Sequence, residues 1–424
     1  MPLTKLQFRP GVNRETTSYS NEGGWFDTDK VRFRFGYPEK IGGWIKQSVN
    51  AFLGTARALH PWVALDGTNF LGVGTHLKYY INEGGAFNDV TPIRATTSAG
   101  DVTFATGFDT LNGAITAETE SIVLNSSSGF PASGRIKIDS EEITYAAISS
   151  NTLTGCVRGV NNTTAATHSD SANVGCATIT VTDTLHGALD NDFVTFSGAA
   201  SLGGLITADV LNQEYQVTSV VSTAVYQIEA REVSTIGSIT TTAGLEPTFV
   251  FSNASDTGNG GSSVVGTYQI NTGLDTTITG NGWNAGFWGR GTWNSATDLT
   301  SSGQTLRIWS HDNFGEDLII NVRDSDIYYW DKSTNAGITF DRAVKLSSLS
   351  GSNKAPTIAK QIIVSDRDRH VIAFGCDSEI NAGTQDPLLI RFCDQENVLE
   401  WQSLVTNTAG DLRIGSGSKI VTAI

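Results

Sequence analysis

Short stretches of this chain alternate between apolar and polar residues, which is the pattern of half-buried β-strands. In residues 30–35, "KVRFRF", basic residues alternate with Val31, Phe33 and Phe35. Residues 134–145, "GRIKIDSEEITY", alternate in the same way on either side of a polar turn. No window keeps the 3.6-residue apolar period of an amphipathic helix. The pattern therefore predicts an all-β protein.

A strand–turn–strand pattern with recurring aromatic residues occurs three times, at 62–81, 309–331 and 364–401. The first two copies read Trp, an Asp within four residues, an apolar strand, a polar turn and a strand with Tyr-Tyr. The third has an Asp-rich turn, two apolar strands and Trp401 near its end. Such repeats are typical of propeller blades. We expect a β-propeller, complete or incomplete, with about six blades at most.

The repeat is interrupted by two runs of short alternating strands with their own turns. They predict two small antiparallel β modules inserted in one propeller loop, which costs little because loop-closure entropy grows only logarithmically with length. The expected domains are an N-terminal arm with the first blade or blades (1–97), module A (98–175), module B (176–255) and the remaining blades (256–424).

Charge separates these segments. The formal net charge is −15, and residues 98–255 account for −12 of it, with 16 acidic and 4 basic residues. The rest of the chain is close to neutral at −3. Tight nucleic-acid binding requires clustered Lys and Arg that displace counterions. The charge distribution therefore argues against a tight nucleic-acid binder.

The cysteines and the N-terminus exclude further classes. None of the four cysteines forms a CxxC pair or has His at ligand spacing, so we expect no zinc site and buried, reduced thiols. The first eleven residues, "MPLTKLQFRPG", lack the apolar segment of a signal peptide. No stretch approaches the roughly 18 apolar residues of a transmembrane helix, so no membrane span is predicted.

Paired carboxylates are the strongest candidates for catalysis. Asp139, Glu141 and Glu142 cluster in "DSEEITY", but neighbouring side chains of a strand point to opposite faces, so Glu141 and Glu142 should not flank one bond. The six histidines are scattered, and no Ser or Cys lies in a nucleophile motif. Neither calcium-loop nor phosphate-loop spacing is present. We expect no catalytic, cofactor-binding or metal-binding residues, and no enzyme.

The basic residues Lys30, Arg32 and Arg34 could line a surface that grips nucleic acid. An RNA-binding sheet motif requires Gly and aromatic residues in an order that "KVRFRFGYPE" does not follow. A half-buried strand is the better interpretation, with the apolar side in the core. Lys30, Arg32 and Arg34 would then line a solvent-filled channel or an inter-subunit surface.

A family resemblance is carried by both ends of the chain. The run "LQFRPGVNRETTSYSNEGGWFDTDKVRFRFGYPEKIGGW" resembles the start of tail nozzle proteins of short-tailed bacteriophages, also described as the packaged-DNA stabilisation or tail tubular protein B-like family. The segments "LRIWSHDNFGEDLIINVRDSDIYYWD" and "DPLLIRFCDQENVLEWQSLVTNTAGDLRIGSGSKIV" resemble its propeller blades. The likeness covers about 1–95 and 280–424.

This resemblance implies a virion protein that is assembled in the host cytoplasm. Six copies would form a ring beneath the portal and its head-to-tail adaptor, with tail fibres or a needle as further partners. DNA would pass through the channel without sequence recognition. The alternatives are a receptor-binding or glycan-cleaving tail protein, for which Trp283, Trp288 and Trp293 are the candidate sugar-binding residues, and a cellular propeller scaffold.

Overall fold

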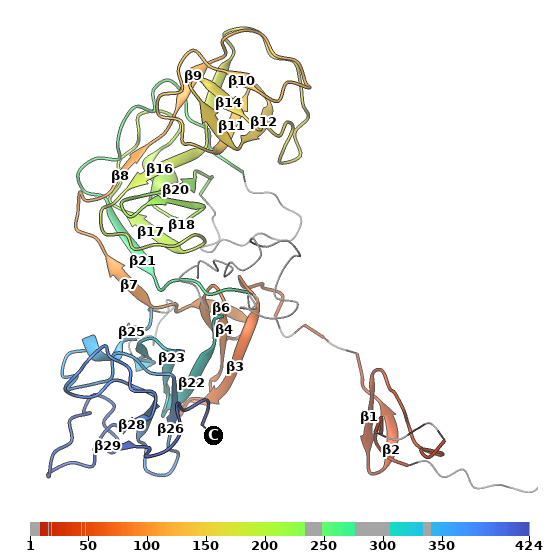
Figure 1. Ribbon diagram of the computed structural model, residues 1–424, viewed down its shortest axis with the longest axis vertical. Coiled ribbons are helices and arrows are strands. Elements are labelled where there is room, and N and C mark those ends of the chain that lie inside the picture. Colours follow the sequence, from red (N-terminus) through yellow and green to blue (C-terminus); the bar gives the residue numbers. More distant parts are fainter. Residues whose placement is uncertain are drawn as a thin grey trace, which may run out of the picture. The chain divides into compact units, whose positions relative to one another are not determined.

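A computed structural model describes residues 9–15, 17, 19–43, 45–46, 48–233, 248–275, 306–333 and 341–423 (Figure 1). The chain divides into two compact units, Met1–Val49 and Asn50–Ile424, which are treated separately below. Regular structure in the described residues is mostly short antiparallel strands. Helix is limited to short pieces such as α1 (Ala208–Leu211) and a 3₁₀ turn at Leu346–Ser348. The all-β prediction is confirmed.

Three four-stranded meanders coincide with the three repeats found in the sequence. In each, consecutive strands pair antiparallel in chain order. The first meander consists of β3 (Ala56–Val63), β4 (Asn69–Thr75), β5 (Tyr79–Glu83) and β6 (Ala86–Asp89). The second consists of β22 (Trp309–Phe314), β23 (Asp317–Val322), β24 (Ile327–Trp330) and β25 (Val344–Lys345). The third consists of β26 (Gln361–Val364), β27 (Val371–Phe374), β28 (Leu389–Phe392) and β29 (Gly410–Arg413).

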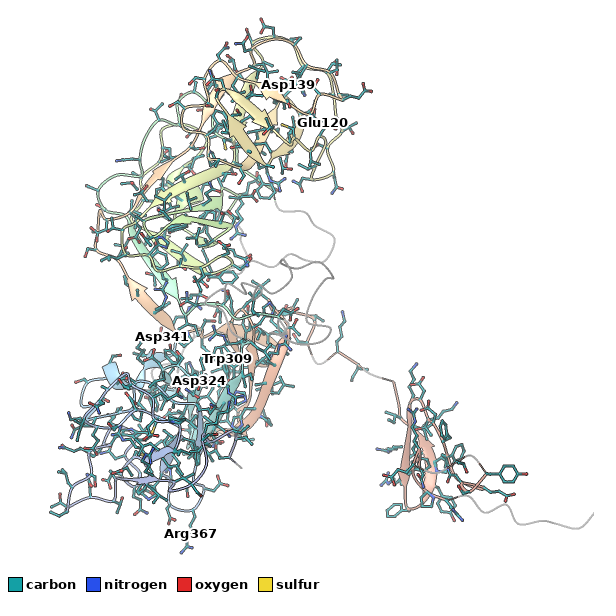
Figure 2. The ribbon with its side chains drawn as sticks, in the orientation of Figure 1. Glu120, Asp139, Trp309, Asp324, Asp341 and Arg367 are labelled. Carbon is teal, nitrogen blue, oxygen red and sulfur yellow. The ribbon has the colours of Figure 1, made fainter. Side chains whose placement is uncertain are left out.

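The second meander buries both of its faces. Alternate residues of β23 point in opposite directions: Leu318 packs in a core with the first meander, and Ile319 packs in a core with the third. Trp309 (Figure 2) lies in the first of these cores, where a Cβ on Gly74 would come within 2.6 Å of its ring. Glycine at this position therefore lets β4 approach the second meander closely.

The three sheets approach one another most closely along their first strands, β3, β22 and β26. Sheets that converge on their first strands and share cores face to face are arranged as propeller blades are. Within the described residues the three meanders do not close into a circle. The predicted propeller and its number of blades therefore stay predictions.

The proximal module follows the first meander. It contains two four-stranded sheets, in the orders β18-β17-β21-β7 and β19-β20-β16-β8, around one core. Its strands are β7 (Ile93–Thr96), β8 (Thr103–Ala105), β16 (Thr178–Thr182), β17 (Phe193–Ser197), β18 (Glu214–Gln216), β19 (Ser219–Ser222), β20 (Val225–Glu229) and β21 (Val265–Gln269).

The nested module lies between β8 and β16 in the sequence, so it interrupts the proximal module. It has its own core and two sheets, in the orders β12-β11-β15-β9 and β10-β14-β13. Its strands are β9 (Phe108–Thr110), β10 (Ile122–Val123), β11 (Gly134–Ile138), β12 (Glu141–Tyr145), β13 (Ala147–Ser149), β14 (Thr152–Thr154) and β15 (Asn173–Cys176).

The sheet pairings differ from the tandem order of modules A and B expected from the sequence. β8 lies within 98–175, yet it pairs with β16 of the proximal module. β21 lies beyond residue 255, yet it pairs with β17 and β7 of the same module. These pairings join strands about 70 to 170 residues apart, which local alternation cannot reveal.

All four cysteines, Cys156, Cys176, Cys376 and Cys393, are buried free thiols, as predicted. Burial raises the pKa of Cys176 and of Cys376 to about 12, so neither forms a thiolate readily.

No helix among the described residues is both long and apolar enough to span a bilayer.

His311, in β22, lies beside the core between the first two meanders and contacts Tyr79 of that core. The His311 ring lies 5.3 Å from the His60 ring and is hydrogen-bonded to the Tyr79 hydroxyl. Burial, and to a smaller extent the neighbouring His60, lowers the pKa of His311 to about 3. The unfolded chain therefore binds a proton at His311 at mildly acidic pH, whereas the folded chain does not.

Stability should consequently fall as the pH drops below the unfolded-state pKa of about 6.5. Between pH 7.5 and pH 5, His311 should contribute a loss of about 1 to 2 kcal/mol in the free energy of unfolding. Thermal melts of wild type and His311→Asn over this range would measure it. The variant should show a shallower pH dependence, and parallel curves would contradict the prediction.

Candidate functional site

The sequence places its candidate functional residues in the N-terminal unit, whose described residues include a hairpin of β1 (Val31–Arg34) and β2 (Tyr37–Lys40) (Figure 1). Phe35 and Gly36 connect the strands, with φ angles of 51° and 85°. Positive φ at both central residues is typical of a type I′ turn, which matches the twist of a two-residue hairpin. Phe35 therefore lies at the tip and is 88% exposed, so its predicted place on the buried side of the strand is wrong.

The three predicted basic residues occupy different positions in this hairpin. Lys30 precedes β1 with a φ of 56°, and its ammonium group lies 3.8 Å from Asp29. Arg32 donates across the hairpin to Glu39 at 3.1 Å. The Arg34 guanidinium lies 5.4 Å from the centre of the Phe35 ring. The alternation of basic and apolar side chains within β1 thus includes Arg32 and Arg34 but not Lys30.

The other side of β1 is partly covered within the same unit. Val31 and Phe33 are half-buried, and the Phe33 ring lies 6.1 Å from the Trp25 ring. None of the described apolar side chains of residues 9–49 is fully buried, however. The half-buried strand is as predicted, but the described residues of this unit form no core around the hairpin.

Sequence reasoning missed a buried ion cluster in the second unit. Lys78 is completely buried, and its ammonium group lies 2.6 Å from Asp89 and 2.7 Å from Glu214. It also lies 4.5 Å from the centre of the Phe193 ring. Arg342 completes the cluster through ion pairs with Asp89 and Glu214.

This cluster joins the first meander, the proximal module and the residues that precede β25. Burial alone would raise the pKa of Asp89, but Lys78 and Arg342 outweigh it and lower that pKa. Two cations thus face two carboxylates in a buried junction, which makes it an ion-paired structural site. The one available signal in the sequence was a lysine inside the apolar run "LKYYI"; its partner Glu214 is 136 residues away.

The carboxylates considered for catalysis form ion pairs and hydrogen bonds within the nested module. Glu141 is completely buried and forms a bidentate pair with Arg158, with both distances 2.7 Å. His168 lies between Glu141 and Asp139, 2.8 Å from each. Burial alone would raise the pKa of Glu141, but the hydrogen bonds from Arg158 and His168 lower it to about 2.

Glu142 makes different contacts, as strand alternation predicts. It accepts a hydrogen bond from Asn161 at 3.0 Å and pairs with Arg135 at 3.4 Å. Glu141 and Glu142 therefore do not face a common space. In the described ranges, no three or more His, Cys, Asp or Glu side chains are grouped so as to hold a metal ion. Trp283, Trp288 and Trp293 lie outside the described residues.

Comparison with known proteins does not assign this chain to a family. No family model matches the chain, and no curated protein matches it. Among solved structures, the chain is similar to the endosialidase of phage phi92 at 10% identity, over 85% of this chain and 47% of that one, with a TM-score of 0.16. The chain thus spans less than half of that protein. A TM-score of this size does not indicate a shared fold.

Replacing Lys78 should destabilise the second unit strongly. Lys78→Met leaves Asp89 and Glu214 buried with Arg342 as their remaining cation, and breaking a buried pair in this way costs about 3 to 5 kcal/mol. Chemical denaturation would measure the free energy of unfolding. Lys419→Met, at an exposed position, is the matched control and should have little effect. Equal effects of the two substitutions would show that the cluster contributes no stability.

The basic hairpin should not bind DNA tightly. Arg32 already has a local acidic partner, and the chain carries a net charge of −15. Duplex DNA should therefore bind no tighter than about 10⁻⁴ M at physiological salt. Arg32→Ala with Arg34→Ala should leave this affinity unchanged in fluorescence anisotropy, as should the control Arg367→Ala at an exposed turn (Figure 2). Tight, salt-sensitive binding that the double substitution removes would make the hairpin a DNA-binding site.

Proposed function

We propose that this chain is a structural component of a phage tail: a ring-shaped nozzle that closes the portal and adaptor channel and conducts DNA at ejection. The observation that carries the proposal is the stack of three meanders that converge on β3, β22 and β26. The resemblance of both ends of the sequence to tail nozzle proteins points the same way. The proposed fold is a β-propeller built from these blades.

The meanders support a propeller because the same packing occurs twice. β3 lies against β22, and β22 lies against β26, with an apolar core between each pair of sheets. Repetition of one sheet-to-sheet rotation around an axis is how blades build a propeller. Three blades fall short of the four to eight that close one, so further blades or neighbouring copies would complete the circle.

The electrostatics of the chain suit a conduit for DNA. A channel wall that binds its cargo tightly would have to break many ion pairs as the genome moves, whereas an acidic or neutral wall has few to break. The net charge of −15 and the local pairing of Arg32 meet this requirement. Sequence recognition would likewise slow passage, and the proposal includes none.

The parts of the second unit are connected by strand pairing and by buried ion pairs, as suits a structural component. The chain enters the proximal module through β7 and leaves it through β21, which pairs with β7, and the Lys78 cluster links this module to the first meander. In the proposed ring, six copies would contact one another and the head-to-tail adaptor, and tail fibres or a needle would attach to it.

Electron microscopy of the purified protein and of the virion tests the proposal. We expect a sixfold ring on the tail axis. A peripheral trimer would contradict the nozzle and favour the receptor-binding or glycan-cleaving alternative. Release of sugar from host polysaccharide by the purified protein would also contradict it.

A further inference from the structure

The described residues of the N-terminal unit bury little apolar surface. A two-stranded hairpin is at best marginally stable alone in water, and small units normally need a core, a metal or disulfides. The described residues of this unit contain no fully buried apolar side chain, and all four cysteines lie in the second unit. The hairpin therefore needs a surface outside itself on which to pack.

The tip of the hairpin presents the side chains for such packing. Phe35 is 88% exposed and Tyr37 is 76% exposed, and the type I′ turn fixes both beside Arg34. Aromatic residues and arginine are enriched at the centres of protein–protein interfaces, where they form the energetic hot spots. Other large apolar side chains of the unit are also exposed: Tyr19, Phe26, Ile41, Ile45 and Val49.

Charge indicates what kind of surface receives the hairpin. Residues 1–49 hold eight basic and five acidic residues, a net charge of +3, whereas residues 50–424 hold 20 basic and 38 acidic residues, a net charge of −18. The net charge of the N-terminal unit is thus opposite in sign to that of the body of the same protein. Complementary charge steers association and selects the partner.

We propose that residues 9–49 form an arm that docks on the acidic body of a second copy of this chain, with Phe35 and Tyr37 as apolar anchors and Arg34 beside them. The proposal rests on the ring-forming function proposed above and assigns the contact between its subunits. Each copy would give one arm and receive another, a head-to-tail arrangement that closes into a ring when the rotation between copies allows it.

Site-specific cross-linking tests whether the arm docks on a second copy of the chain. Phe35→Cys introduces an exposed thiol, while the four natural cysteines are buried, so a thiol-reactive photo-cross-linker should attach at position 35. Leu185→Cys, at an exposed position of the proximal module, is the matched control. Illumination of the purified full-length protein should give a product of twice the chain mass from position 35 and much less from position 185. Cross-links confined to single chains would overturn the proposal.

Substitution of the anchors tests their role in assembly. Phe35→Ser with Tyr37→Ser should raise the concentration at which half of the copies are assembled by at least about tenfold, as expected for two interface aromatics. The two side chains are exposed in the single chain, so circular dichroism and melting of the body should not change. Leu185→Ser is the control and should assemble as wild type does. Unchanged assembly of the double variant would overturn the proposal.

The outcomes separate this proposal from the nozzle itself. Sixfold rings that persist in the Phe35→Ser, Tyr37→Ser protein would refute the arm and leave the nozzle standing. Arm-dependent assembly into a different symmetry would support the arm and refute the nozzle. A wild-type protein that stays monomeric in native mass spectrometry would refute both.

Discussion

A β-sheet has two faces, and the second meander must bury both of them. Its strands alternate so that Leu318 points toward the first meander and Ile319 toward the third. This one sheet therefore sets the order of the stack and the convergence on the first strands. Each end of the stack presents a further sheet face, and the exposed Leu59 and Val63 lie on the outer side of β3. Blades that repeat this packing would cover such faces, which is why the stack supports a propeller and a larger assembly.

The inserted modules depend on the same first meander. β7 leaves it and β21 returns beside β7, so the chain enters and leaves the proximal module at one place. The Lys78 cluster pairs the buried charges at this place and connects the first meander with the proximal module. The nested module is attached to the proximal module in the same way: β8 leads into the nested module, and β16 leads out of it and pairs with β8. The two insertions thus cost little loop-closure entropy, because the two ends of each insertion lie side by side in paired strands.

The N-terminal unit contrasts with everything that follows it. The described residues of the second unit form four apolar cores, whereas those of the N-terminal unit form none. Its I′ turn nonetheless holds Phe35 and Tyr37 in defined positions on an otherwise small element. Exposed aromatic residues on a unit without a core among its described residues are the basis of the proposed docking, in which the stabilising contacts come from the partner.

The sequence by itself determined the strand class, the three repeats and the burial of the cysteines, because these follow from periodicity, composition and spacing within short windows. It also determined that Glu141 and Glu142 diverge, since alternation is a property of any strand. Only the tertiary structure decided that β8 and β21 belong to one module, that Lys78 meets Glu214, and that Phe35 lies at a turn. The first two depend on contacts between residues more than 70 positions apart. The third depends on a backbone with positive φ, which the alternation of "KVRFRF" gave no reason to expect.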